Sequence, residues 1–176
     1  MKLGSDLCFT SLDFNLSGMS LPPADSAALA VANLKLAWGI LMFDMWVLNG
    51  DRHPGNLSFD TALNQVQIFD HSHALFSRDF SKVANDHALE PNRCLAPHMT
   101  SVDGLTDWVH HIQTVPERYI RAVVYEVADA GLNVSAIKAQ ECYDFLVTRR
   151  SRLIELVKTH ATTLFPKVPA DDWKGI

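Results

Sequence analysis

The sequence has 176 residues, of which 48% are hydrophobic and 20% are charged, and this is enough for one buried core but too little for two ordinary domains. Its formal charge of −5 comes from 15 basic and 20 acidic residues without a basic block, which argues against nucleic acid as a partner. The three cysteines lie far apart and form no C-x-x-C pair, which favours a reducing, cytoplasmic setting.

The first elements are a lead-in and a long apolar helix. Residues 1–24 carry no sustained hydrophobic period, so we expect a short extended segment without a domain of its own. Between Ser26 and Leu48, apolar residues recur at three- and four-residue steps, which predicts one long helix with Asp25 or Ser26 as its cap. The polar residue Asn33 and the charged residues Lys35 and Asp44 interrupt this stretch, so we interpret it as a helix buried in a protein core and expect no membrane partner.

A tight loop and a small hairpin are expected after the helix. Residues 49–56, NGDRHPGN, are rich in turn formers. Short β-type runs at 57–59 and 66–69 flank a polar turn, which predicts a hairpin with Asp70 at the end of its second strand. Residues 77–101 have no clean period, and we expect a long surface loop there.

The last third is expected to be helical. One helix covers 105–112, a second runs from Pro116 to Gly131, and a third begins at Asn133. The apolar stripe of the second helix consists of Ile120, Val123, Val124 and Val127. The expected apolar face of this third helix consists of Ile137, Cys142, Phe145, Leu146, Leu153 and Leu156. Three arginines beside that face, Arg149, Arg150 and Arg152, are interpreted as solvated, with contact to an acidic substrate or partner as the alternative. We thus expect a lobe over 25–165 and a polar tail over 166–176, in which Trp173 is available to anchor the tail or a partner.

Two aspartates and one asparagine have the spacing that phosphoryl transfer from ATP requires. The transition state is loose and anionic, so the protein must mainly position the reactants and neutralise charge. Asp51 is placed to orient or deprotonate the attacking hydroxyl, and Asn56 follows five residues later on the same turn. A hairpin then returns the chain, so that Asp70 can meet Asn56 across a Mg²⁺ ion. Ordinary turn chemistry explains each residue alone, but it does not explain their common spacing.

These residues resemble a known family. The stretch 50–56, GDRHPGN, resembles the catalytic loop of phosphatidylinositol 3- and 4-kinases and their bacterial relatives. The longer strings 43–56, FDMWVLNGDRHPGN, and 69–76, FDHSHALF, are most similar to HipA-like kinases of bacteria. The resemblance covers the chain between residues 25 and 160.

The resemblance implies a fold and a set of roles. The fold would be a protein-kinase-like C-terminal lobe, mainly α with a small β-hairpin, that lacks most or all of the N-terminal lobe. The cofactors would be ATP and Mg²⁺, with Asp51 as the catalytic aspartate and with Asn56 and Asp70 as metal ligands and nucleotide-binding residues. Arg52 would also belong to the nucleotide-binding set. His53 would support the catalytic loop and contact the phosphates.

Kinases also grip the phosphates with a glycine-rich loop and a strand lysine. Only Lys2 and Lys35 precede Asp51, and residues 3–5 resemble the hinge between kinase lobes. We therefore expect half of a split or minimal kinase, with a protein partner or a second copy in place of the N-terminal lobe. The alternatives are a pseudokinase-type binding or regulatory protein that pairs through the surface left by that lobe, and a fragment of a longer chain.

The histidines after Asp70 are a secondary feature. If the strand continues, His71 and His73 alternate, so only one of them should face the cleft. Metal ligation by these histidines is the less favoured interpretation, because Mg²⁺ prefers oxygen ligands.

Overall fold

The structure is a computed structural model that describes residues 2–3, 6–7, 23–60, 65–71, 73–75, 92–129 and 134–176. This part of the chain is mainly helical, with two small antiparallel sheets of two strands each. The first sheet pairs β1 (Lys2–Leu3) with β2 (Asp6–Leu7), and the rest of the predicted lead-in up to residue 22 lies outside the described residues. The predictions of a mainly α fold and of a small hairpin are confirmed.

The predicted long helix is divided in two at Asn33, so the expectation of one continuous helix was wrong. Helix α1 (Ser26–Ala32) is capped by Asp25, whose carboxylate accepts hydrogen bonds from the amides of Ala27 and Ala28. Helix α2 (Leu34–Val47) begins anew at Asn33, whose side-chain oxygen accepts from the amide of Leu36 over 3.0 Å. Asparagine caps a helix well because its short side chain satisfies an amide that has no helical partner.

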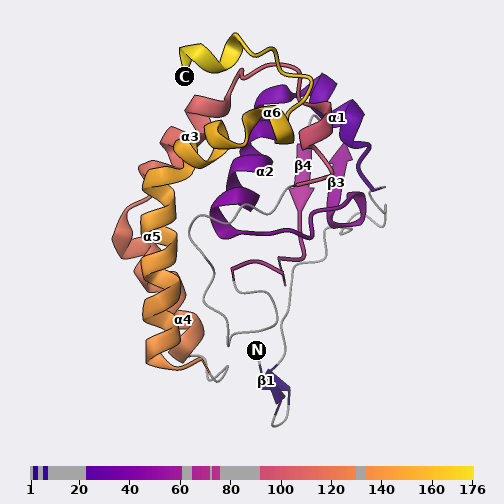
Figure 1. The fold of residues 1–176 in the computed structure, drawn as a ribbon. Helices are drawn as coiled ribbons and strands as arrows, with labels where there is room; N and C mark the ends of the chain where they lie inside the picture. The colour runs from indigo at the N-terminus through magenta and orange to yellow at the C-terminus, as the bar shows by residue number, and fades with distance from the viewer. Residues whose placement is uncertain are drawn as a thin grey trace.

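The predicted hairpin is present, and it follows α2 after the short 3₁₀ turn Pro54–Asn56. Strand β3 (Leu57–Asp60) pairs antiparallel with β4 (Gln65–Ile68), and Leu57 lies opposite Ile68. Pro23 forms a bridge with Ser58 on the outer side of β3. Figure 1 shows the hairpin beside α2, with the long C-terminal helix on the other side of the molecule.

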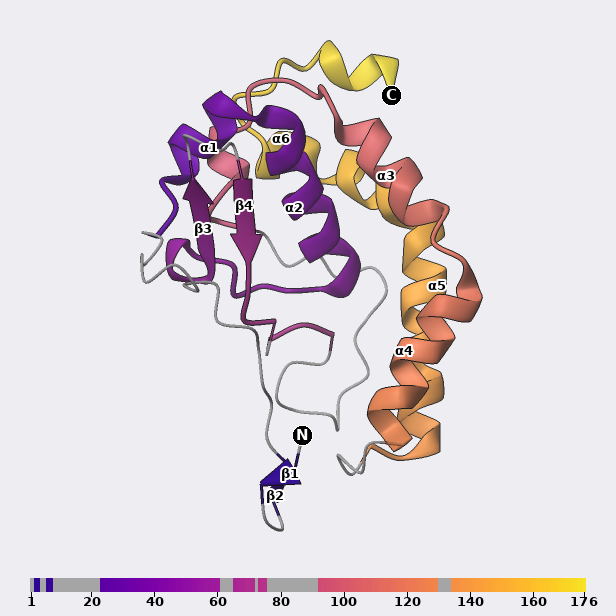
Figure 2. The ribbon, with the colours of Figure 1, turned by 180° about the vertical axis from the view of Figure 1, so that it is seen from behind.

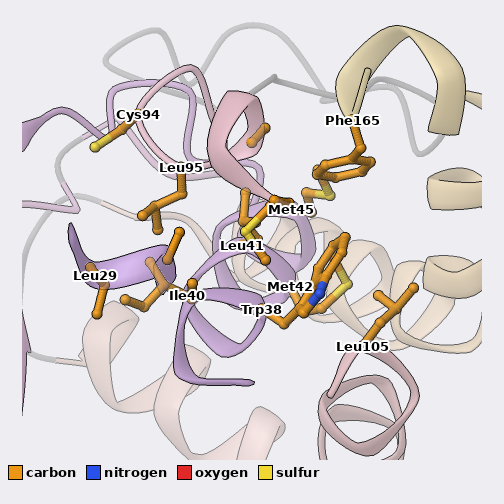
Figure 3. Packing of buried hydrophobic residues seen from close by; sticks show 14 of the residues in the cluster. Leu29, Trp38, Ile40, Leu41, Met42, Met45, Cys94, Leu95, Leu105 and Phe165 are labelled. Atoms are coloured by element: carbon orange, nitrogen blue, oxygen red, sulfur yellow. The ribbon is translucent and has the colours of Figure 1, made fainter. Parts of the chain in front are cut away.

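The main core surrounds α2 on all sides, so the predicted buried helix is confirmed for this segment. Trp38, Leu41, Met42 and Met45 are fully buried on α2, and Figure 3 shows several of them between Leu95, Leu105 and Phe165. Because α2 is apolar around most of its circumference, it is suited to the centre of a fold. No helix in the described ranges is long and apolar enough to cross a membrane.

The predicted surface loop over 77–101 is partly wrong. Residues 76–91 lie outside the described residues, but the part from Asn92 to Met99 is packed into the core and contains the 3₁₀ turn Ala96–His98. Leu95 and Met99 are fully buried there. The short spacing of apolar residues in this stretch fits neither a helix nor a strand period, so periodicity could not reveal its burial.

Three further helices form the side of the molecule opposite the hairpin. Helix α3 (Leu105–Gln113) packs on α2, α4 (Glu117–Asp129) packs on α5 (Ala136–Thr159), and Figure 2 shows α4 and α5 side by side from behind. The predicted end at Gly131 and cap at Asn133 lie outside the described residues, and the cap that the structure shows is Ser135. The side-chain oxygen of Ser135 accepts from the amide of Lys138 over 3.2 Å.

Two apolar residues and one arginine on these helices differ from the prediction. Ile137 is 73% exposed and Val123 is 62% exposed, although both were placed on apolar stripes. Arg149 was interpreted as solvated, yet it is 0% exposed. Its Nε donates to the carbonyl of Met45 over 2.6 Å, and its guanidinium lies over the ring of Phe145. The last turn of α2 has carbonyls without helical partners, and a buried cation from α5 satisfies one of them.

The C-terminal residues return to the main core. After α6 (Ala161–Leu164), Phe165 is fully buried against Trp38, with ring centroids 4.8 Å apart. Trp173, in the 3₁₀ turn Asp172–Gly175, packs edge-on against Trp38 and lies 5.7 Å from Phe165 between ring centroids. The tail over 166–176 is polar in composition, but its one tryptophan holds it on the core, as one of the two interpretations of Trp173 proposed.

Candidate active site

The site begins where α2 ends. Leu48 adopts a left-handed conformation with φ 55°, and the amide of Asn49 donates to the carbonyl of Asp44 over 2.8 Å. This reversal stops the helix and directs residues 49–56 away from its axis. Trp46 and Arg149 fix the helix end to α5, because the indole nitrogen of Trp46 donates to the carbonyl of Leu146 over 2.9 Å. The loop therefore leaves a helix end that two hydrogen bonds hold on α5.

Asp44, in the last turn of α2, is a buried carboxylate whose oxygens accept four hydrogen bonds. Oδ1 accepts from Nδ2 of Asn49 at 3.0 Å and from Nη2 of Arg52 at 2.8 Å. Oδ2 accepts from Nε of Arg52 at 2.9 Å and from Nδ2 of Asn92 at 2.9 Å. A carboxylate has about four lone-pair sites, so Asp44 is saturated by its neighbours. It is a structural anion and has no capacity left for a ligand.

Arg52 is the cation at the centre of the site. Besides the two bonds to Asp44, Nη1 donates to the carbonyl of Asn56 at 2.9 Å and to the carbonyl of Phe69 at 2.8 Å. Its Nη2 also lies 2.9 Å from Nε2 of His71. All five donors of the guanidinium thus have partners inside the protein. Arg52 was expected to bind nucleotide, but its burial and these bonds make it a residue that positions the loop.

The loop over residues 49–56, expected to be the catalytic loop, and the end of β4 are joined through their backbones. The amide of Phe69 donates to the carbonyl of Asn56 over 3.2 Å, and Arg52 bonds the carbonyls of both residues. Asp70 is the next residue, and it is exposed with a left-handed backbone at φ 52°, a conformation that Asp tolerates better than most residues. The structure therefore brings the segments of Asn56 and Asp70 together, two residues after β4 ends.

Asp51 lies near the start of the loop, and its side chain is 45% exposed. Its carboxylate lies 3.8 Å from Nε2 of His73, and its carbonyl accepts from Nδ2 of Asn56 over 3.1 Å. Because the amide nitrogen of Asn56 is used in this bond, the amide oxygen is the atom that remains for a metal ion. His53 is exposed, and its Nδ1 accepts from the amide of Gly55 over 3.0 Å, so it shapes the turn.

His71 and His73 both contact site residues, so the expected alternation does not hold. The expectation was wrong because residues two apart in a strand lie on the same face, and β4 in any case ends at Ile68. His71 packs edge-on against Phe43, with ring centroids 5.5 Å apart, and faces Arg52. Burial, and then the charge of Arg52, lower the pKa of His71 below its usual value.

Oxygen atoms dominate the chemistry available for a cation at this site. Asp51 and Asp70 supply carboxylates, and Asn56 supplies a carboxamide oxygen, which are the ligand types that Mg²⁺ prefers. Among the described residues, no group of three or more His, Cys, Asp or Glu side chains is arranged to hold a metal ion. Mg²⁺ in nucleotide sites takes one or two protein ligands plus phosphate oxygens and water, so the residues fit a metal that arrives with a nucleotide.

An apolar cavity of about 570 Å³ lies between the end of α2, residues 71–75 and helices α4 and α5. Val47 and Leu75 form one wall and are joined by a bond from the amide of Leu75 to the carbonyl of Val47 at 2.6 Å. Residues of α4 and α5, including Val123 and Cys142, form the other wall. Trp46 also lines the cavity, but its indole nitrogen is bonded to Leu146, so its polar atom is not offered to a ligand.

Comparison with known proteins gives the family. The family model of HipA-like kinases matches residues 2–140, which is more than half of the chain. The chain belongs to the HipA-like kinase family. Neither a search of curated proteins nor one of solved structures found a match. Membership in this family supports a kinase-like phosphotransferase, and the catalytic-loop sequence from which the resemblance was inferred lies within the matched residues.

Sequence reasoning missed the buried residues that hold this HipA-like loop in place. Asp44 was noted only as a charge inside a helix, although a lone aspartate eight residues before an arginine at a helix end was a usable signal. Asn49 was seen only as a turn former. Asn92 lies in the stretch that was expected to be a surface loop, and no pattern in the sequence connects it to Asp44, 48 residues earlier.

Proposed function

We propose that this HipA-like chain is the catalytic-loop lobe of an ATP- and Mg²⁺-dependent phosphotransferase. Asp51 is the catalytic aspartate, which orients the acceptor hydroxyl and takes its proton. Asn56 and Asp70 hold the metal ion through oxygen atoms. A bound Mg²⁺ would bridge the phosphates and neutralise the charge that develops on them.

The observation that carries the proposal is the junction between the catalytic loop and β4. A loop with an aspartate and an asparagine five residues apart is joined to the segment of a second aspartate by the Phe69 to Asn56 bond and by Arg52. Phosphoryl transfer depends on positioning and charge neutralisation more than on covalent chemistry. A rigid buried ion pair under two solvent-facing carboxylates meets that need.

Asp51 also has a neighbour that suits its proposed role. Its carboxylate is open to solvent and lies near His73, which can keep it oriented without removing its charge. His53 supports this role from the loop, because its bond to the amide of Gly55 fixes the turn between Asp51 and Asn56. The phosphate contact of His53 is part of the proposal, since its side chain is exposed on that turn.

The groups that grip the triphosphate form a further part of the proposal. In kinases these are a glycine-rich loop and a strand lysine. In the described ranges, the hydrogen bonds and ion pairs of the catalytic loop and hairpin involve no lysine. We propose that a separate stretch of polypeptide, on this chain or on a partner protein, supplies them, which is the split or minimal kinase arrangement.

The decisive experiment measures phosphate transfer from labelled ATP. The chain is assayed alone and mixed with the products of neighbouring genes, with Mg²⁺ and with EDTA. We expect Mg²⁺-dependent transfer that Asp51→Asn reduces by at least about a hundredfold, because it removes the proton acceptor. Asp103→Asn is the matched control, since Asp103 is an exposed aspartate outside the site. Transfer that survives Asp51→Asn would contradict the proposal.

A second candidate function is self-association in a binding or regulatory role. The apolar cavity favours it, because Tyr119 and Val123 at its α4 wall are exposed apolar side chains, and such patches commonly mark interaction sites. Sedimentation velocity tests it with Val123→Asp and with Val31→Asp, a control at an 88% exposed valine away from the cavity. We expect Val123→Asp alone to reduce association, and a monomer at every concentration would remove this candidate.

A further inference from the structure

Asn92 lies at the centre of the buried polar network, although it is far from the catalytic loop in the sequence. Its side chain is 0% exposed, and its Nδ2 donates to Oδ2 of Asp44 over 2.9 Å. In the part of the chain that the structure describes, it is the only side-chain donor to the Asp44 carboxylate that comes from outside α2 and the catalytic loop. Asn92 therefore connects a different part of the fold to this carboxylate.

The other end of the amide is held by the core. Its Oδ1 accepts from the amide of Cys94 at 3.1 Å and from the amide of Leu95 at 3.0 Å. Leu95 is fully buried, and Sγ of Cys94 lies 2.8 Å from Oγ of Ser26 at the start of α1. The orientation of the Asn92 side chain is thus fixed by groups that are packed in the core.

A chain of bonds leads from Asn92 to the reactive residues. Asn92 fixes the Asp44 carboxylate, and that carboxylate holds Arg52 by two bonds. Arg52 then holds the carbonyls of Asn56 and Phe69, which come at the end of the catalytic loop and directly before Asp70. A rotation of the Asp44 carboxylate would therefore move the guanidinium that joins the two segments.

We propose that Asn92 is a positioning residue for phosphoryl transfer, which acts through Asp44 and Arg52 to fix the spacing between Asn56 and Asp70. The catalytic part of this inference rests on the proposed function, whereas its structural part does not. Metal-site residues of this kind, which orient the ligands without touching the metal, typically contribute ten- to a hundredfold to affinity or activity.

The alternative is that Asn92 only caps its own turn, and Asn92→Asp separates the two roles. Aspartate has the same shape and keeps an oxygen for the amides of Cys94 and Leu95. It replaces the donor that faces Asp44 by a second carboxylate oxygen, and two carboxylates at this distance disfavour each other. If Asn92 only caps its turn, the disturbance should stay close to Asn92 and Asp44, whereas a positioning residue should pass it through Arg52 to Phe69.

Amide hydrogen exchange tests the structural part without any assumption about activity. The amides of Phe69 and Asn49 report on the network, because they bond the carbonyls of Asn56 and Asp44. We expect Asn92→Asp to accelerate exchange at both amides by at least about tenfold and to leave α4 and α5 unchanged. Unchanged exchange at Phe69 and Asn49, or equal acceleration throughout the chain, would overturn the proposal.

Calorimetric titration with Mg²⁺-ATP tests the catalytic part. We expect Asn92→Asp to weaken Mg²⁺-dependent binding by about tenfold or more. Asn33→Asp is the matched control, because Asn33 also caps a turn through its oxygen but lies outside the network. If the wild-type chain binds no nucleotide while Phe69 still exchanges faster in Asn92→Asp, the proposed function fails, and only the structural part of the inference stands. If Asn92→Asp binds like the wild type, the positioning role in catalysis is refuted.

Discussion

Nε2 of His71 accepts a hydrogen bond from Nη2 of Arg52, across 2.9 Å. The direction follows from chemistry, because a guanidinium carries donors only and the imidazole must supply the lone pair. His71 is therefore neutral with its proton on Nδ1, and this agrees with the lowered pKa that burial and Arg52 give it. The residue that follows Asp70 thus completes the set of acceptors around Arg52.

A replacement of His71 that keeps the acceptor should be tolerated, and one that removes it should not. We expect His71→Gln to change the free energy of unfolding by less than about 1 kcal/mol, because its amide oxygen can accept from Arg52. We expect His71→Phe to lower it by about 1–3 kcal/mol, because one buried N–H loses its partner. Urea unfolding followed by circular dichroism measures both. Equal stability of the two variants would contradict the acceptor role.

The buried pair of Arg52 and Asp44 should be far more sensitive than an exposed pair. Lysine has one ammonium group and cannot reproduce five donors in a planar fork. We expect Arg52→Lys to lower the free energy of unfolding by about 3 kcal/mol or more, since it leaves buried acceptors and part of a buried charge without partners.

Arg152→Lys is the control for this change, because Arg152 pairs with the largely exposed Glu155 at 3.6 Å. Pairs of that kind contribute about 0–1 kcal/mol. Chemical unfolding of the two lysine variants side by side gives the comparison. A loss of similar size in both would mean that the network around Arg52 does not hold the site together.

Helices α2 and α3 meet at a glycine that cannot be enlarged. A Cβ atom on Gly39 would overlap the ring of Trp108 on α3. We expect Gly39→Ala to lower the free energy of unfolding by about 1–3 kcal/mol through overpacking, although alanine is the better helix former by about 1 kcal/mol. Gly175→Ala is the matched control, because its Cβ would meet no atom within 4 Å. A Gly39→Ala variant at least as stable as the wild type would show that the two helices are packed differently.

Cys142 should react slowly with alkylating reagents, because its thiol is difficult to ionise. Burial, and then the charge of Glu141, raise the pKa of Cys142 to about 11. The thiolate is the reactive form, so alkylation at pH 8 should be much slower than for an ordinary cysteine and should still increase beyond pH 10. Mass spectrometry of the iodoacetamide-treated peptide measures the rate, with the denatured chain as reference. Equal rates in the folded and denatured chain at pH 8 would contradict this environment.

The elements that sequence reasoning predicted well are those with a strong local signal. The hairpin, α3 and the buried character of α2 follow from apolar periods, and the loop follows from its turn residues. The junction of the Asn56 and Asp70 segments was also predictable, because a hairpin returns the chain to its starting point. The family match over residues 2–140 confirms the resemblance that was read from the loop.

The errors arose where tertiary contacts decide the outcome. Asn33 could continue a helix or cap one, and the packing of α1 selects the cap. Arg149 is charged and was therefore placed in solvent, but the end of α2 needs a donor for the carbonyl of Met45. Arg52 was expected to bind nucleotide because it lies within the motif of the loop. In the structure its guanidinium points into the core and donates to the carboxylate of Asp44. Asn92 had no local signal at all.

Calorimetric titration of the chain with ATP, in the presence and absence of Mg²⁺, is the most direct test of the central claim that Asn56 and Asp70 jointly hold a metal–nucleotide complex. We predict binding that requires Mg²⁺ and that Asp70→Ala weakens by at least about tenfold, with only a small loss of melting temperature in the free protein, because Asp70 is exposed but alanine tolerates its left-handed backbone less well. ATP binding of equal strength without Mg²⁺, or with Asp70→Ala, would contradict the account.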